Sequence, residues 1–257
     1  FQQLGMLVNQ RQLMTEMLNS PSGLVLTAGP VGSGKTTTLY SCLNCLDCFN
    51  QNIMTIEDPV EFELSGVTQV QVQNKRGLTF SAGVRALLRQ DADTLMIGEI
   101  RDEETVQIAI RAALSGTLVL STIHANSATG AVASLMQLGV TGFSAGNALS
   151  GVVFQRLVHR ICKNCREPYE ADAMERKELE VEGDEPITLY RSRGCDSCFR
   201  TGYHGRIGVY EMVKIDEEMR HVIFSRPTHS ELQAAATRAG MIPLKAHVRE
   251  LVISGDI

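Results

Sequence analysis

Residues 23–40 read GLVLTAGPVGSGKTTTLY, and this stretch decides the fold of the chain. An apolar run that suits a buried strand, residues 23–29, leads directly into a glycine-rich turn, and a helical run follows the turn. Residues 29–36 match the pattern GxxxxGK[ST] at every position. A strand, a turn of this kind and a helix form a phosphate-binding loop, the P-loop, whose backbone amides point at phosphate oxygens.

The P-loop predicts a bound nucleoside triphosphate with Mg²⁺. Lys35 can reach the β and γ phosphates, and the Thr36 hydroxyl can bind the metal ion. The residues that we expect to contact the nucleotide here are Gly29, Pro30, Val31, Gly32, Ser33, Gly34, Lys35, Thr36 and Thr37. A chance glycine turn is the alternative, and the agreement of strand, turn and helix argues against it.

Three further apolar runs resemble strands of the same sheet. They begin at Ile53 (IMTIED), Thr94 (TLMIGE) and Thr117 (TLVLSTIH), and amphipathic segments separate them. This alternation predicts an α/β fold in which helices cover a parallel sheet. The clearest helix follows Asp102, a candidate cap, because apolar residues recur there at helical spacing: Val106, Ala109, Ile110, Ala113 and Leu114.

Hydrolysis of a nucleotide also needs carboxylates that hold the metal ion or activate water. Glu57 and Glu99 end two of the strands, and open parallel sheets bind ligands at the carboxyl ends of their strands. We therefore expect both acids in the catalytic site, and His124, which ends the fourth strand, at the γ phosphate. A purely structural histidine is the alternative for His124. Solvation or helix capping is the alternative, with equal weight for three nearby acids: Asp58, Glu61 and Asp102.

Arg85 and Arg89 stand four residues apart in FSAGVRALLRQD and so share one face of a helix. Two cations on one face could stabilise phosphate charge, most naturally on a neighbouring subunit, or could simply be solvated. The sequence leaves both interpretations open.

Composition weakens several classes of function. The net charge of −5, without a basic and aromatic-rich stripe, argues against a nucleic-acid partner. No apolar run approaches the ~20 residues that span a bilayer, so we expect no direct membrane insertion. Seven cysteines favour a reducing cytosol over a disulfide scaffold. The first residue is Phe1 rather than Met, from which we expect a fragment of a longer protein.

Four cysteines form two CxxC pairs that a 29-residue gap separates. Four thiolates suit tetrahedral Zn²⁺, and a site without an open coordination position is structural rather than catalytic. We therefore expect a structural Zn²⁺ bound by Cys162, Cys165, Cys195 and Cys198. Two disulfides, or four unrelated thiols, are the alternatives.

Cys42, Cys45 and Cys48 lie three residues apart after the P-loop. A step of three residues turns a helical side chain back by about 60°, so the three thiols would form one slanting stripe. Cysteine is readily buried, and no fourth ligand is evident nearby. We expect this stripe to be the buried face of the helix rather than a metal site.

The character of the sequence changes after Gln155. Residues 156–214 are charged and offer few apolar side chains for a core, whereas helical periodicity returns from about residue 215, with a break at Pro227. We expect a nucleotide-binding core at residues 1–155, a tetracysteine zinc-binding subdomain at 156–214 and a C-terminal helical region at 215–257.

Four of these motifs together resemble one known family. GPVGSGKTTTLY, TIEDPVE, RALLRQDADTLMIGEIRD and LVLSTIHANSA resemble the Walker A, Asp box, Walker B and His box of the secretion ATPases that power type II secretion and type IV pilus assembly. QRLVHRIC and GYHGRIGVYE extend the resemblance over essentially the whole chain. The chain departs from common patterns at Gly98, where many P-loop proteins carry a metal-binding aspartate, and at DADT, where the family usually has DPD.

The resemblance implies a RecA-like ATPase that uses ATP and Mg²⁺, forms a homo-hexameric ring at the cytoplasmic face of the inner membrane and drives pilin or pseudopilin assembly through a platform protein. It implies Glu99 as the catalytic carboxylate, Glu57 as an acid acting on water or Mg²⁺, and His124 as a γ-phosphate contact, with arginines from a neighbouring subunit. It also implies an N-terminal domain, which we expect to be absent from this chain. The tetracysteine module resembles that of the assembly and secretion members rather than the retraction ATPases.

Two other functions stay open. RecA-like motors commonly move DNA or RNA, so a nucleic-acid translocase is the main alternative, although the acidic composition argues against it. The second is an assembly scaffold that binds ATP but hardly hydrolyses it. The residues do not distinguish protein secretion, pilus extension and DNA import.

Overall fold

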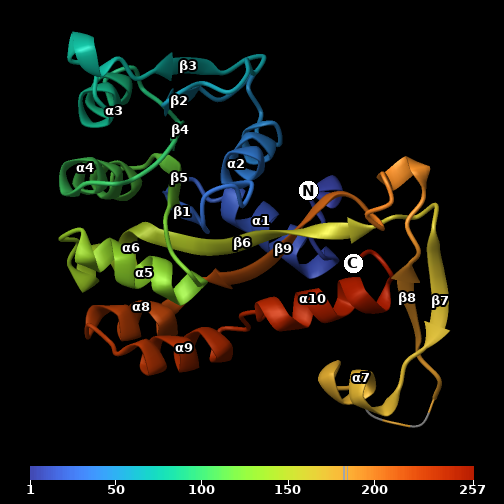
Figure 1. Ribbon diagram of the computed structural model, residues 1–257. Helices are drawn as coiled ribbons and strands as arrows, with labels where there is room; N and C mark the ends of the chain where they lie inside the picture. Colours follow the sequence, from blue (N-terminus) through green and yellow to red (C-terminus); the bar gives the residue numbers. More distant parts are fainter. Residues whose placement is uncertain (182, 184) are drawn as a thin grey trace.

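Seven strands form one sheet at the centre of the computed structural model, which describes residues 1–181, 183 and 185–257 (Figure 1). Their order across the sheet is β3-β2-β4-β5-β1-β6-β9. Neighbouring strands run parallel except for β6 and β9, which are antiparallel. The bounds are β1 (Gly23–Ala28), β2 (Ile53–Glu57), β3 (Thr68–Gln71), β4 (Thr94–Ile97), β5 (Leu118–Ile123), β6 (Leu149–Ile161) and β9 (Tyr203–Lys214). The predicted α/β fold with a parallel sheet is confirmed.

Helices cover both faces of the sheet (Figure 1). On one face, α1 (Val8–Leu18) and α2 (Lys35–Leu43) enclose a core that includes Val25. On the other, Leu24 and Leu26 belong to a larger core. Because successive side chains of a strand point to opposite faces, the continuous apolar run of β1 supplies both cores. The helices of the larger core are α3 (Phe80–Leu88), α4 (Glu103–Leu114), α5 (Ala128–Gln137), α6 (Gly142–Ala148), α8 (Glu217–Phe224) and α9 (His229–Arg238).

Helix α4 begins and packs as its sequence predicts. Asp102 Oδ1 accepts a hydrogen bond from the Thr105 amide at 2.8 Å and so caps the helix. Val106 and Ala109 are fully buried, whereas Leu114, the last residue of the helix, is 51 % exposed. Asp102 therefore has a capping role in this structure.

The expected boundary at residue 155 lies inside β6. This strand pairs with β9 from Gly151, opposite Lys214, to Ile161, opposite Tyr203, so residues on both sides of the boundary share one sheet. The expectation of few core residues after position 155 is wrong for the second half of β9, where a continuous run is buried: Val209, Tyr210, Glu211, Met212 and Val213. On one face of β9, α1 covers Tyr210 and Met212. On the other face, α10 (Leu244–Ile253) covers Val209, while Val213 packs into the larger core and Glu211 accepts a hydrogen bond from the Ala128 amide at the start of α5.

Beyond the far ends of β6 and β9 the chain forms a small module, residues 162–202, which we call the cysteine module (Figure 1). Within it, β7 (Arg166–Glu170) and β8 (Thr188–Ser192) pair antiparallel, and α7 (Ala173–Glu178) follows β7. The chain leaves the sheet at the end of β6 and returns to it at the start of β9, so two long strands join the module to the main sheet.

The expected stripe of three buried cysteines is wrong for two of its members. Helix α2 ends at Leu43, after which tighter turn hydrogen bonds replace the helical pattern. Cys42 is buried on the helix, and its Sγ lies 3.8 Å from Met14 Sδ; burial raises the pKa of this thiol. Cys45 is exposed and Cys48 is half-buried, because the chain leaves the helix before it reaches them.

A buried histidine ties the C-terminal helix to the start of the chain. His247 Nδ1 accepts a hydrogen bond from the Tyr210 amide at 3.0 Å, so its Nε2–H donates to the Gly5 carbonyl at 3.0 Å. Gln10 Nε2 donates to the Tyr210 carbonyl at 3.0 Å. This arrangement requires the neutral imidazole, and burial lowers the pKa of His247.

We expect the free energy of unfolding to fall as the pH drops below the ordinary histidine pKa of 6.5, because the unfolded chain then binds a proton that buried His247 takes up less readily. The contribution is fully present above that pH. In His247→Gln, which keeps one donor and one acceptor but lacks the imidazole ring that aligns them, the pH dependence of the free energy of unfolding between pH 7.5 and 5.5 should become shallower. Weaker hydrogen bonds should cost about 1–2 kcal/mol at the upper pH. Urea unfolding at both pH values measures this.

His229→Gln is the matched control, because His229 is exposed at the start of α9. It should keep the parent's pH dependence. A His247→Gln variant with the same slope as the parent would show that His247 does not cause the acid destabilisation.

Candidate active site

The P-loop joins β1 to α2, and glycine is required where it passes close to β6. Gly29 has φ 154°, and a Cβ there would lie 2.5 Å from the Gln155 carbonyl oxygen. Helix α2 begins directly at Lys35, so its free first-turn amides face the loop. Lys35 Nζ donates to the carbonyls of Gly29 at 2.9 Å and Pro30 at 3.0 Å. Burial lowers the pKa of Lys35, while the negative charge of Glu99 acts against that shift.

Gln155, in strand β6, supports the P-loop by a hydrogen bond. It was not among the predicted site residues. Its Nε2 donates to the Ser33 carbonyl at 2.7 Å, and the side chain is buried at 1 % exposure. The only sequence signal is a lone amide within the apolar run GVVFQ, and such a signal does not indicate its partner. The contact joins residues 122 positions apart.

A cavity opens at the carboxyl ends of the parallel strands and brings together the predicted residues of four segments. Lys35 and Thr36 line it from the P-loop, and Glu57, Glu99 and His124 line it from the ends of β2, β4 and β5. The other lining residues are Val31, Gly32, Asp58, Pro59, Glu61, Phe80, Met96, Gly98, Arg101 and Thr122. This cavity is the candidate active site.

Inside the cavity, Glu99 lies between the imidazole of His124 and the guanidinium of Arg101. Its Oε1 is 2.8 Å from His124 Nε2, and its Oε2 is 2.5 Å from Arg101 Nη2. The hydrogen bond to Glu99 raises the pKa of Arg101. The Glu99 side chain is 15 % exposed, so its carboxylate is held in place but can still reach a ligand in the cavity.

Gly98 lies in close contact with β2. A Cβ at this position would lie 3.3 Å from both the Ile56 carbonyl oxygen and Glu57 Cα. An aspartate here would therefore press on the backbone of the neighbouring strand. The cavity instead offers the carboxylates of Glu57, Asp58, Glu61 and Glu99 to a metal ion.

Glu57 is buried at 2 % exposure and held by uncharged donors. Thr55 Oγ1 and Tyr40 OH each donate to its carboxylate at 2.5 Å, and Gln69 Nε2 donates at 3.2 Å. Sequence reasoning missed these three partners. Only Tyr40 carried a signal in the sequence, since it is the last residue of the motif GPVGSGKTTTLY.

Several predicted site residues lie outside this cavity. Arg85 Nη2 forms an exposed ion pair with Glu104 Oε1 at 2.7 Å, and Arg89 is exposed just after the end of α3. Thr37 is exposed and lines an adjoining hollow with Phe62 and other residues of the P-loop region: Gly32, Ser33, Gly34, Lys35, Thr36, Glu61, Leu157 and Arg206. The structure thus brings the carboxylates and His124 to the P-loop but not the two arginines.

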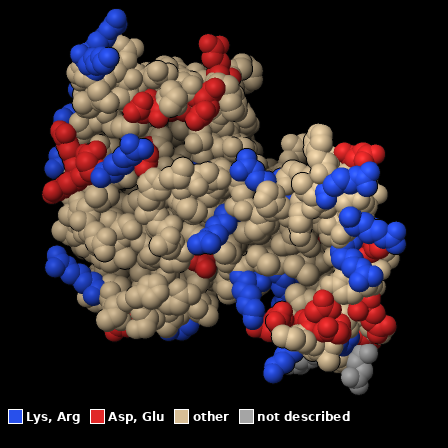
Figure 2. Space-filling view, in the orientation of Figure 1, with Lys and Arg blue, Asp and Glu red and all other residues tan. Residues whose placement is uncertain are grey.

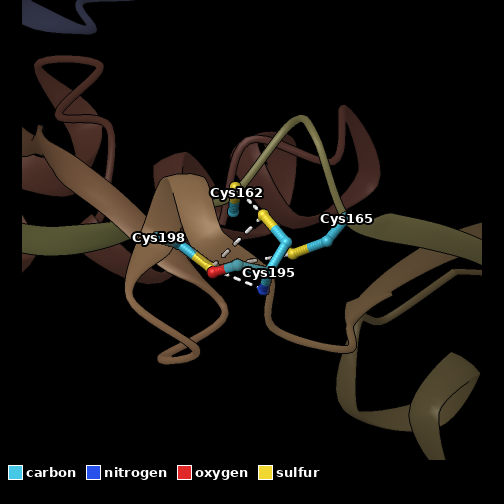
Figure 3. A group of neighbouring side chains, drawn as sticks. All are labelled: Cys162, Cys165, Cys195 and Cys198. Atoms are coloured by element: carbon cyan, nitrogen blue, oxygen red, sulfur yellow. Dashed lines mark hydrogen bonds between the residues drawn. The ribbon is translucent and has the colours of Figure 1, made fainter.

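The four module cysteines converge from two loops, as Figure 3 shows. All four Sγ atoms lie within 4.8 Å of one another, and the Cys162–Cys195 and Cys165–Cys198 pairs are each 3.9 Å apart. These separations exceed the ~2.05 Å of a disulfide, so the thiols are unbonded. Amides of Cys195 and Gly202 point at Cys198 Sγ and lower the pKa of that thiol to about 6. Four thiols at these separations fit a tetrahedral metal ion.

Within the described residues, no helix combines the length and the apolar character that a membrane span requires.

Relatives among known proteins match this chain over most of its length. Type II secretion system protein E of Pseudomonas aeruginosa is 47 % identical over 239 residues, which are 93 % of this chain and 48 % of that protein. Type II secretion system ATPase E of Vibrio cholerae is 44 % identical over 246 residues, 96 % of this chain and 46 % of that protein. The chain spans about half the length of the curated relatives it matches.

Solved structures share the fold. The ATPase DotB of Legionella pneumophila superposes with a TM-score of 0.71 at 22 % identity, over 100 % of this chain and 62 % of that one. The pilus retraction motor PilT with bound ADP gives 0.62 at 25 % identity, over 96 % of this chain and 65 % of that one. The sequence model of the family described as Type II/IV secretion system protein matches residues 1–257. The chain therefore belongs to the Type II/IV secretion system protein family.

Proposed function

We propose that this chain is the ATP-hydrolysing part of a motor that powers pilin or pseudopilin assembly in a type II secretion or type IV pilus system. The observation that carries the proposal is the convergence of Glu99, His124 and Glu57 on one cavity with the P-loop residues Lys35 and Thr36. Family membership supports the secretion role, and the relative from Vibrio cholerae is named an ATPase.

Each cavity residue takes a distinct role in this proposal. Lys35 exchanges its loop carbonyl partners for the β and γ phosphates, and Thr36 offers its hydroxyl to Mg²⁺. The metal ion supplies positive charge that neutralises the phosphates. Glu99 orients and activates the attacking water, Glu57 acts on water or Mg²⁺, and His124 contacts the γ phosphate.

The proposed assembly is a homo-hexameric ring at the cytoplasmic face of the inner membrane, with a platform protein as its partner. Arg85 and Arg89 are exposed and lie outside the cavity, so any nucleotide that they contact belongs to a neighbouring subunit. Arg85 would exchange its ion pair with Glu104 for that contact.

We further propose that the four cysteines hold a structural Zn²⁺. Support comes from the four neighbouring sulfur atoms and from the amides of Cys195 and Gly202, which point at Cys198 Sγ. The ion would contribute on the order of 10 kcal/mol to a module that has a small core.

Neither of the alternatives gains support. On the face in Figure 2, Lys and Arg side chains are interspersed with Asp and Glu rather than gathered into one basic stripe. Family membership also favours secretion over nucleic-acid translocation. A scaffold without turnover differs from a motor only in its rate of hydrolysis, which an experiment must measure.

In Glu99→Gln we expect ATP binding to be retained and kcat to fall at least about a hundredfold, because the amide cannot accept a proton from water. Phosphate release and the binding of a fluorescent ATP analogue measure the two quantities. Glu217→Gln, an exposed acid in the first turn of α8, should match the parent. Equal rates in Glu99→Gln and the parent would remove Glu99 from catalysis.

Single- and double-stranded DNA should leave the hydrolysis rate of the parent unchanged within about twofold, since the chain has a net charge of −5 and the face in Figure 2 shows no single basic stripe. The assay is run at low salt, where electrostatic binding is strongest. Strong stimulation by either form of DNA would support the translocase and contradict the secretion motor.

In Cys195→Ser we expect zinc content well below one equivalent and a melting temperature lower by about 10 °C, because three thiolates bind the ion more weakly than four. Elemental analysis and thermal unfolding measure these effects. Cys45→Ser is the control, since Cys45 is exposed and lies outside the cluster. Full zinc content in Cys195→Ser would contradict the four-cysteine site.

A further inference from the structure

Three donors hold the carboxylate of Glu57 and leave one position open. Oε1 accepts from Thr55 Oγ1 at 2.5 Å and from Gln69 Nε2 at 3.2 Å, and Oε2 accepts from Tyr40 OH at 2.5 Å. A carboxylate offers about four acceptor positions. Among the residues that the structure describes, one position therefore stays free, and it belongs to Oε2.

The groups around the Tyr40 hydroxyl determine the direction of its proton. The Glu61 amide donates to the hydroxyl at 3.2 Å, and Gln69 Nε2, whose two N–H groups also face Glu57 Oε1 and the Phe62 carbonyl, lies 3.4 Å away. Because these amide groups can only donate, the phenol's own proton points to Glu57 Oε2 at 2.5 Å. Burial and the hydrogen bond to Glu57 raise the pKa of Tyr40 to about 12, so the hydroxyl keeps this proton at neutral pH.

Tyr40 also joins three parts of the site. It lies on α2, the helix that begins with Lys35. Its hydroxyl contacts Glu57 at the end of β2, and its ring packs edge-on against Phe62 with centroids 4.6 Å apart. Together with the Glu61 contact, these interactions attach residues 59–63 to the helix that carries the phosphate cradle.

We propose that Tyr40 is a positioning residue of the active site. Its hydroxyl turns the Glu57 carboxylate so that the free position of Oε2 faces the nucleotide cavity, and it holds residues 59–63 beside that cavity. The catalytic part of this inference rests on the proposed function, because Glu57 acts on water or Mg²⁺ only if the chain hydrolyses ATP. The contact itself is independent of hydrolysis.

The test begins with Tyr40→Phe, which removes the hydroxyl and keeps the ring against Phe62. We expect kcat to fall about tenfold to a hundredfold, since a hydrogen bond to a charged group is lost. The affinity for a fluorescent ATP analogue should stay within about twofold of the parent, because the P-loop is untouched. Tyr210→Phe is the matched control: Tyr210 is also buried, and its hydroxyl donates to the Leu4 carbonyl at 3.2 Å rather than to Glu57.

A double-mutant cycle separates positioning from general support of the fold. If Tyr40 acts through Glu57, the double variant that carries both Tyr40→Phe and Glu57→Gln should have the same kcat as the single variant Glu57→Gln. Losses that multiply, or a Tyr40→Phe variant that hydrolyses ATP at the parent rate, would overturn the inference while leaving the proposed function intact.

Amide hydrogen exchange of residues 59–63 tests the Tyr40 contact without measuring ATP hydrolysis. The Glu61 amide, which donates to Tyr40 OH, should exchange about tenfold faster in Tyr40→Phe, while the segment 103–114 keeps its rate. Unchanged exchange at Glu61 would overturn the inference even if the parent proved inactive. A parent that binds but does not hydrolyse ATP would contradict the proposed motor, and faster exchange at Glu61 in the variant would then still support the contact.

Discussion

The parallel register of the central strands is the constraint on which the site depends. Ala28 lies opposite Ile123 in β5 and Phe154 in β6, and Ile97 lies opposite Ile56 in β2. Because β1, β2, β4 and β5 end at nearly the same level, the residues that follow them emerge at one edge of the sheet. A shift of one residue would turn the side chains of a strand to its other face and separate the carboxylates from the P-loop.

Strand β6 connects this edge with the cysteine module. Gln155 donates to the P-loop at Ser33, and Cys162 follows the end of the same strand. The last residues of the chain also contact this region, since Arg160 pairs with Asp256 at 2.7 Å and the Ile161 amide donates to the Asp256 carbonyl at 3.0 Å. Both termini lie near the module end of the sheet (Figure 1). A metal ion in the module would therefore stabilise a region that also holds the C-terminal helix.

Glu57 and Glu99, two of the cavity's four carboxylates, occupy different environments. Glu99 is partly exposed and lies beside His124 and Arg101, whereas Glu57 is buried among uncharged donors. A partly exposed carboxylate can exchange its partners if a ligand enters the cavity. The Glu57 carboxylate is held by three hydrogen-bond donors and so keeps one orientation. A fixed orientation suits a group that must meet a ligand in one defined geometry.

The local sequence pattern was sufficient to predict many features of this protein. The P-loop, the strand ends that carry Glu57, Glu99 and His124, and the two CxxC pairs are short-range features, because strand, turn and metal-knuckle geometry depend on neighbouring residues. Only the tertiary structure decided which side chains support them. Tyr40, Gln69 and Gln155 find partners 17, 12 and 122 residues away, and no spacing rule indicates such pairs. It also decided that α2 ends before Cys45 and that β9 joins the main sheet, since both depend on packing against segments distant in the chain.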